Sequence, residues 1–384
     1  MKLRSAFAAL LAGALLAALV ACRQETLPDY PPAYREYAYV TNGKSDTVTV
    51  VDLLNFKVEK TLTVGRNPTG VAANPKRNEI YVANTGSNNV SVIDAESNTV
   101  VATLGVHGAP FFVDVSADGR RAVVANSGSN NVSVLDLDRR AVVANIEVGA
   151  KPGLARISPD GKTIVVSNRG DDSVSLLDAQ KPALRATLPA CSAPEDIAIL
   201  PDSSKAFVAC TGSNQVAAID LKNGRVLALL DVGKTPIHLA LKPDGGELIV
   251  SNFDSNSISI IETTANEVDG SFLIGNQPAR CAISLDGTLA YVTNFADDTL
   301  AVFSLDSRKL VTVLHVGDGP DALALSPTEE FLLTVDVRAG DLALVRRFLR
   351  KGNPVWALIT MIPVGSQPNQ IAVKNFILKK PPVK

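Results

Sequence analysis

Three residues spaced 42 positions apart carry the side chains of this chain best suited to chemistry. Asp196, His238 and Arg280 each stand two residues after a proline, and Glu195 and Asp321 each stand directly after an equivalent proline. A carboxylate, an imidazole and a guanidinium at one level can bind an anionic or mixed-charge ligand. An acid beside a histidine can also form a proton-transfer pair. These five residues are the predicted ligand site, and no residue is assigned a catalytic role.

The spacing belongs to a repeat that runs through the chain. One set of repeated positions is Asn42, Asn84, Asn126, Asn168, Cys210, Asn252, Asn294 and Asp336. The second set is Pro68, Pro110, Pro152, Pro194, Pro236, Pro278 and Pro320, with Pro368 six residues late. Alternating apolar residues and turns rich in Gly, Asn, Asp and Ser indicate antiparallel hairpins. Four short strands in each period of this length are typical of a β-propeller blade.

The strand before the repeated asparagine also indicates a family. Tyr39-Val-Thr-Asn42 and Tyr291-Val-Thr-Asn294 resemble the motif of the YVTN-repeat β-propellers, over roughly residues 37–375. The resemblance implies the fold. It does not imply one function, because relatives include surface-layer proteins, a DNA-binding protein, lactonase-type enzymes, and subunits of quinoprotein and haem d1 enzymes.

The number of strands predicts eight blades. The asparagine-type strand and the strand after the proline each occur eight times. The chain starts with three strands of a blade at 37–64 and ends with a lone first strand at Asn369-Gln-Ile-Ala-Val373. We therefore predict an all-β, eight-bladed propeller of four-stranded antiparallel blades, with the C-terminal strand joining the N-terminal three to close the ring. Seven blades, common in this family, are the alternative.

In a propeller the first strands line the central channel, so the five candidate residues fall at its mouth. The alternative is a hydrated mouth where these polar side chains satisfy one another. Asp114 and Arg156 replace alanine on neighbouring first strands, and we interpret them as a structural ion pair between blades. The repeated asparagine is interpreted as structural, supporting the turn that follows it.

The fifth repeat departs from the pattern at two cysteines. Cys210 replaces the asparagine, and Cys191 stands in the loop before Pro194. We predict a Cys191–Cys210 disulfide, which export would permit; two free thiols are the alternative. Cys281 stands at an apolar repeat position and is expected to be buried. No Cys/His spacing typical of a metal site occurs, and we expect no metal.

The eighth repeat contains the length change, Val345-Arg-Arg-Phe-Leu-Arg-Lys-Gly352. This predicted interaction loop comprises Arg346, Arg347, Arg350 and Lys351, with Trp356 nearby. Strand direction places it on the face opposite the channel mouth. Cations next to apolar residues suit an anionic lipid, a nucleic acid or a protein partner; a solvated loop is the alternative.

The N-terminus predicts an exported lipoprotein. Lys2 and Arg4 precede an apolar run at 6–21, and Leu19-Val-Ala-Cys22 resembles a bacterial lipobox. We expect a signal peptide at 1–21, lipid attachment at Cys22 and a Pro-rich tether at 22–36. The propeller then spans 37–375 and a basic tail 376–384. An ordinary secretory signal is the alternative. The expected location is the outer membrane or cell surface, with the folded domain in the periplasm or outside.

The composition and net charge limit the classes of function that the chain can have. A hydrophobic content of 46%, a charged content of 20% and a net charge of −2 describe a packed globular protein without a general nucleic-acid surface. We expect a non-catalytic envelope propeller that binds a protein or small ligand at its channel face, with no cofactor. The first alternative is a periplasmic enzyme or cofactor-binding protein (haem d1-like, quinoprotein-like or lactonase-like), with His238 as a possible axial ligand. The second is a nucleic-acid-binding propeller.

Overall fold

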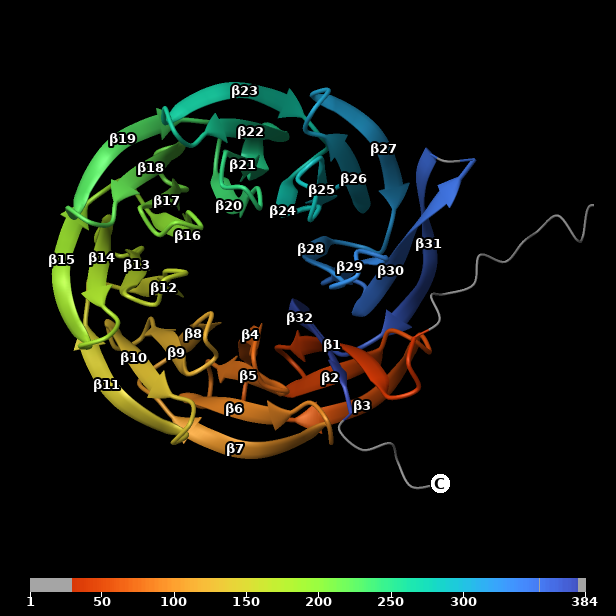
Figure 1. Cartoon of the computed structure of the whole chain (residues 1–384), viewed down its shortest axis with the longest axis horizontal. Helices are drawn as coiled ribbons and strands as arrows, with labels where there is room; N and C mark the ends of the chain where they lie inside the picture. The colour runs from red at the N-terminus through yellow and green to blue at the C-terminus, as the bar shows by residue number, and fades with distance from the viewer. Residues whose placement is uncertain (1–29, 352, 379–384) are drawn as a thin grey trace, which may run out of the picture.

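The computed structural model describes residues 30–351 and 353–378. The predicted signal peptide, Cys22 and the last residues of the basic tail lie outside the described residues. Eight four-stranded antiparallel sheets form a ring, as Figure 1 shows. Eight blades, rather than the alternative seven, are therefore confirmed. No helix within the described ranges has the length and apolar character needed to cross a membrane.

Each blade is built from four strands that run outward from the axis of the ring. The inner strands are β4 (Pro68–Ala73), β8 (Pro110–Val115), β12 (Pro152–Ile157), β16 (Pro194–Ile199), β20 (Pro236–Leu241), β24 (Pro278–Ile283), β28 (Pro320–Leu325) and β32 (Pro368–Ile377). The second strands are β1 (Tyr34–Asn42), β5 (Glu79–Asn84), β9 (Arg121–Asn126), β13 (Thr163–Asn168), β17 (Lys205–Cys210), β21 (Glu247–Asn252), β25 (Leu289–Asn294) and β29 (Phe331–Asp336).

The two outer positions complete the blades. The third strands are β2 (Thr47–Asp52), β6 (Asn89–Asp94), β10 (Asn131–Asp136), β14 (Ser173–Asp178), β18 (Gln215–Asp220), β22 (Ser257–Glu262), β26 (Thr299–Ser304) and β30 (Asp341–Arg350). The outer strands are β3 (Lys57–Thr63), β7 (Thr99–Gly105), β11 (Ala141–Glu147), β15 (Ala183–Pro189), β19 (Arg225–Asp231), β23 (Glu267–Leu273), β27 (Lys309–His315) and β31 (Asn353–Pro363). A single 3₁₀ turn, η1 (Phe253–Ser255), occurs in the described ranges.

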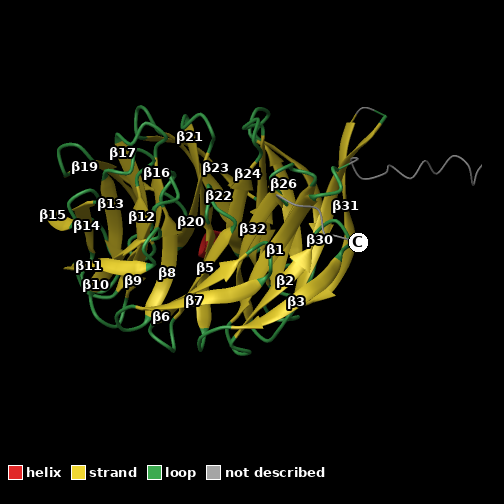
Figure 2. Cartoon of the chain, turned by 60° about the horizontal axis from the view of Figure 1, so that its bottom comes forward, coloured by secondary structure: helices red, strands yellow, loops and turns green. Residues whose placement is uncertain are grey.

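The two faces of the ring follow from strand direction. We call the face where the inner strands begin the proline face. It also holds the ends of the second strands, because Pro68 pairs with Asn84. We call the opposite face the terminal face, since β1 begins and β32 ends there with Tyr34 paired to Ile377. Figure 2 shows loops at both faces of the ring.

The ring closes as predicted, by pairing of β32 with β1 in the sheet β3-β2-β1-β32. The pairing is longer than expected, since Tyr34, Arg35 and Glu36 of the predicted tether belong to β1 and β32 continues to Ile377. Phe376 packs against Tyr37 with ring centroids 6.1 Å apart. Burial of these aromatic rings stabilises the extension.

The turn after each second strand repeats because one backbone position lies in the left-handed region. Four residues after the repeated Asn position, φ is positive in all eight repeats, at Asp46, Asn88, Asn130, Asp172, Asn214, Asn256, Asp298 and Gly340. Asn, Asp and Gly tolerate this conformation best. In seven repeats the Asp or Asn side chain also accepts a backbone N–H of the loop before the next proline in the sequence, as when Asp172 accepts the N–H of Ala193 at 2.8 Å.

The repeated asparagine fixes the same turn from inside the blade. Asn168 Nδ2 donates to the hydroxyls of Ser173 and Ser175, both at 2.9 Å. Its side chain also packs against Gly149, which stands three residues before Pro152. A Cβ at Gly149 would lie 2.6 Å from Asn168 Nδ2. The asparagine is therefore structural, as predicted, although its main partners here are side chains rather than backbone.

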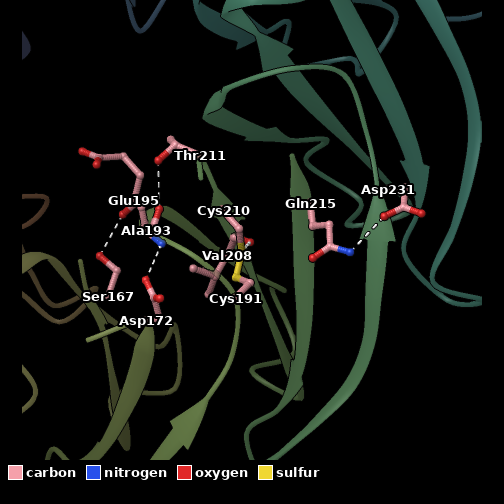
Figure 3. The surroundings of a disulfide bond; sticks show 10 residues. All are labelled: Ser167, Asp172, Cys191, Ala193, Glu195, Val208, Cys210, Thr211, Gln215 and Asp231. Carbon is pink, nitrogen blue, oxygen red and sulfur yellow. Dashed lines mark hydrogen bonds between the residues drawn. A yellow bond between two sulfur atoms is a disulfide. The ribbon is translucent and has the colours of Figure 1, made fainter. Parts of the chain in front are cut away.

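The fifth repeat shows what replaces this contact. Cys191 occupies the position of the loop glycine and Cys210 that of the asparagine. In the structure the two residues form a disulfide with their Cα atoms 5.7 Å apart (Figure 3). The close glycine–asparagine contact, which five other blades make, has thus become a covalent bond. Cys281 is buried and free.

The eighth repeat changes the chemistry of the same position. Asp336 replaces asparagine, and the residue five positions later, a hydroxyl or amide residue in the seven other repeats, is Asp341. Asp336 is fully buried. Burial, and then the neighbouring Asp341, raise the pKa of Asp336 to about 8, and burial raises the pKa of Asp341 as well. The two acids therefore share a proton near neutral pH.

This acid pair predicts a pH-dependent stability. An unfolded Asp titrates near pH ~4, so the folded protein holds an extra proton between about pH 4 and pH 8 and loses stability as the pH rises through that window. Asp336→Asn supplies an amide donor to Asp341. We expect the variant to be about 1–3 kcal/mol more stable than the wild type at the upper end of the window, measured by urea unfolding at both ends. Exposed Asp306→Asn is the control, and an unchanged pH slope in Asp336→Asn would contradict the shared proton.

Candidate functional site

The residues predicted to form a ligand site meet in one cavity at the proline face. All eight inner strands contribute to its wall, and its volume is about 340 Å³. The predicted residues Glu195, Asp196, His238, Arg280 and Asp321 all line it, from the consecutive inner strands β16, β20, β24 and β28. One side of the mouth is therefore polar.

The opposite side of the mouth is mainly apolar and aromatic. Phe111 and Phe112 of β8 line the cavity together with Val71 of β4 and Leu154 of β12. In a ring of eight blades, β8 lies four blades from β24, and so stands across the channel from Arg280. The cavity thus has a charged wall opposite an apolar and aromatic wall, and Arg156 lines the cavity on the aromatic side.

Asp196 is held by the backbone of two neighbouring blades. Its Oδ1 accepts the N–H of Ile197 at 2.9 Å, and its Oδ2 accepts the N–H of Leu239 on the next inner strand at 3.0 Å. Arg156 approaches the same carboxylate at 3.9 Å. Inner strands present one unpaired edge to the channel, and a buried N–H without a partner is costly. Asp196 therefore fastens adjacent blades.

His238 makes the equivalent contact one blade further. Its Nδ1 accepts the N–H of Cys281 at 3.2 Å, so the neutral ring carries its proton on Nε2, 3.7 Å from Asp196 Oδ2. Burial lowers the pKa of His238 to about 4. Asp196 opposes this shift, while Arg280 and Arg156 add to it. The imidazole is neutral at physiological pH, and its Nδ1 lone pair is engaged by the backbone.

The predicted pair of Asp114 and Arg156 is confirmed as an ion pair between blades. Arg156 Nη1 lies 3.2 Å from Asp114 Oδ1, and the N–H of Ile157 donates to Asp114 Oδ2 at 2.9 Å. Burial raises the pKa of Asp114, and Arg156 opposes that shift. The Arg156 guanidinium also lies over the Phe112 ring, 4.5 Å from its centroid. Its charge is therefore largely matched within the protein.

Sequence reasoning missed Arg169. This residue follows the repeated Asn168, and its Nη1 donates to both carboxylate oxygens of the cavity-lining Glu195 at 3.0 Å. Its guanidinium lies 5.1 Å from the centroid of the Phe111 ring. A charge at this position was visible in the sequence, because the other repeats carry Gly, Thr, Ser, Phe or Val there.

Arg280 differs from the other two arginines. Its backbone N–H donates to Thr293 at 3.0 Å, but its guanidinium makes no hydrogen bond with any described residue. The nearest carboxylate is Asp321, 4.0 Å from Arg280 Nε. The side chain is 28% exposed and lines the cavity. A guanidinium with open donors beside a concave surface is suited to an anion.

The predicted interaction loop is an extension of the hairpin β30–β31. Arg346 pairs with Glu330 at 2.7 Å and Arg347 with Glu329 at 3.9 Å. Trp356 is buried and pairs with Arg347 across the hairpin. Arg350 and Lys351 are exposed at the tip. The extension lies on the terminal face, away from the cavity.

No three His, Cys, Asp or Glu side chains come together in the described ranges in a way that could hold a metal ion. His238 and Asp196 are close, but both Asp196 oxygens and His238 Nδ1 are committed to backbone N–H groups. What the mouth offers most directly is therefore anion recognition by Arg280 rather than proton transfer.

The fold and this site define an eight-bladed β-propeller with a polar channel mouth. Residues 29–157 match a family model described as YNCE-like beta-propeller. This match and the eight-bladed ring confirm the resemblance to the YVTN-repeat β-propellers. A comparison with curated proteins finds no significant match.

Solved structures share the architecture at low sequence identity. Hydrazine synthase of Kuenenia stuttgartiensis is 21% identical with a TM-score of 0.60. The match covers 73% of this chain and 95% of the hydrazine synthase chain. The structure described as "Dihydro-heme d1 dehydrogenase NirN in complex with DHE" is 16% identical with a TM-score of 0.73, covering 90% of this chain and 77% of that chain. Identities this low show a common fold alone.

The lowered pKa of His238 predicts acid sensitivity. An unfolded histidine titrates near pH ~6.5, so stability is complete above that pH and is lost as the pH falls toward about 4. His238→Gln can still accept the Cys281 N–H. Between these two pH values, we expect the free energy of unfolding of His238→Gln to fall by about 1–3 kcal/mol less than that of the wild type, measured by urea unfolding. His315→Gln, at an exposed position, should behave as wild type; an equal loss in His238→Gln would contradict the assignment.

Proposed function

We propose that this protein is an envelope-anchored, non-catalytic propeller that binds a small anionic ligand at the channel mouth on its proline face. The observation that carries the proposal is that the guanidinium of Arg280 makes no hydrogen bond with any described residue, and Asp321 approaches it only to 4.0 Å. Arg156 and Arg169 are matched by Asp114 and Glu195, whereas Arg280 keeps its donors available. A carboxylate is one of the groups that a guanidinium binds through two parallel hydrogen bonds.

The cavity indicates the size and character of the ligand. Its volume of about 340 Å³ is near the lower limit of ligand pockets, which span roughly 300–1,000 Å³. A carboxylate at Arg280 would place the remainder of a small molecule toward Phe111 and Phe112. A ligand with one acidic end and one apolar or aromatic end therefore fits best.

Calorimetric titration with benzoate, which has both features, and with succinate tests the site. Arg280→Gln should weaken binding at least about tenfold, because a hydrogen bond to a charged group contributes roughly 1.5–3 kcal/mol. Arg66→Gln, an exposed arginine on the same face, is the matched control. Binding that is equal in Arg280→Gln and wild type would place the ligand elsewhere, and no carboxylate binding at all would overturn the proposal.

The anchoring part of the proposal rests on Cys22 and the apolar run before it, which lie outside the described residues. Labelling with radioactive palmitate in a bacterial host should mark the protein, and Cys22→Ser should abolish the label and release the protein from the membrane fraction. A label that persists in Cys22→Ser would contradict lipid attachment at this residue.

A cofactor-binding propeller is the second candidate, favoured by the fold shared with the NirN complex. The surroundings of His238 weigh against an axial ligand role in this chain. Its Nδ1 accepts the Cys281 N–H, so the proton sits on Nε2, and binding a metal through Nε2 would require that proton to leave. The anion-binding role needs no such change.

A further inference from the structure

Exposed apolar residues gather on the terminal face around the point where the chain enters the fold. Leu285 is 67% exposed, Ile377 59% and Leu349 58%. Leu285 belongs to the blade β24–β27, Leu349 to the blade β28–β31 and Ile377 to the closing blade, and these three blades are consecutive in the ring. Among the large hydrophobic side chains of the described ranges, only Leu273 on the proline face is more exposed, at 79%. Isolated exposed apolar residues are common, whereas a group of them on one face can mark an interaction site.

Two exposed cations stand beside these residues. The strands of the hairpin β30–β31 are longer than the third and outer strands of the other blades, and Figure 1 shows the hairpin projecting past the ring. At its tip, Arg350 and Lys351 are exposed and make no ion pair or hydrogen bond with the described residues. Leu349 precedes them directly. Arg346 and Arg347, by contrast, are engaged by Glu330 and Glu329.

The N-terminal segment reaches the fold at the same place. Tyr30 donates to Glu330 at 3.0 Å and stacks on Tyr34 with ring centroids 4.5 Å apart. Tyr30 also lines a surface hollow together with Phe348 and Leu349 of the hairpin. Cys22 is eight residues before Tyr30 in the sequence, and eight residues span at most about 29 Å.

We propose that this terminal-face patch, comprising Leu285, Leu349, Arg350, Lys351 and Ile377, rests on an anionic lipid bilayer. The proposal rests on lipid attachment at Cys22, which holds the patch within reach of the same membrane. Apolar side chains enter the interfacial region, and the two cations bind lipid phosphates. The contact adds orientation to attachment, because it turns the proline face and its cavity away from the membrane.

Vesicle binding of the full chain carrying Cys22→Ser tests the patch without an acyl chain. The probes are vesicles of phosphatidylcholine alone and of phosphatidylcholine with phosphatidylglycerol. We expect binding to the anionic vesicles only, and at least a fivefold loss in Leu349→Ser and in the double variant Arg350→Glu/Lys351→Glu. Trp356, the single tryptophan of the chain, lies in the hairpin and provides a local fluorescence readout of the contact.

Matched controls come from the proline face. Leu273→Ser removes a more exposed leucine and Lys44→Glu reverses an exposed lysine there, and neither should change vesicle binding. Thermal unfolding of every variant establishes that it is folded; should Leu349→Ser fail to fold, the charge variant decides. Absent binding, equal binding to neutral vesicles, or unchanged binding in the patch variants would overturn the proposal.

Self-association through the patch in the absence of lipid, seen by analytical ultracentrifugation and abolished by Leu349→Ser, would also overturn it in favour of a second copy. The outcomes are separable from those of the proposed function. Loss of palmitate labelling concerns Cys22 alone, and carboxylate binding at Arg280 is measured without vesicles. Arg280→Gln should bind vesicles as the unaltered chain does.

Discussion

Closure of the ring is the constraint on which the rest of the structure depends. The extensive contacts of each blade are with its two neighbours, so the cavity keeps its shape only if the last inner strand pairs with the first three strands of the chain. The pairing of β1 with β32 over Tyr34–Asn42 supplies that link and leaves no blade incomplete. Eight inner strands then stand around one channel, and polar side chains such as Asp196 and His238 satisfy backbone N–H groups of the adjacent strand.

This arrangement explains why much of the polar mouth is occupied by the protein itself. An inner strand has a free edge, and carboxylates or an imidazole from the preceding blade complete it. Asp114, Asp196 and His238 share this role. A charged cluster in a channel is therefore not in itself a binding site. What distinguishes Arg280 is that its backbone is satisfied by Thr293 while its guanidinium remains open.

The repeat made most of the fold predictable. Equivalent positions occupy equivalent environments, so the period gave the strands, the blade count, the mode of closure and the Asp114–Arg156 pair. Features outside the period were not predictable in the same way. The strand at Tyr34–Glu36 depends on its partner at the other end of the chain, and Arg169 enters the site from a turn by side-chain reach. Whether Asp196 faces a ligand or a backbone N–H is decided by the twist between blades, which spacing alone does not encode.

The disulfide of the fifth repeat links this blade to the timing of folding. In the five blades with the glycine–asparagine contact, the contact between the loop and the second strand needs no reagent to form. Cys191 and Cys210 need an oxidant. A newly made chain in a reducing compartment thus lacks both the bond and the amide donors that Asn168 or Asn252 supplies to its own blade. The fifth blade is therefore held less firmly while the two cysteines are reduced than after they are bonded.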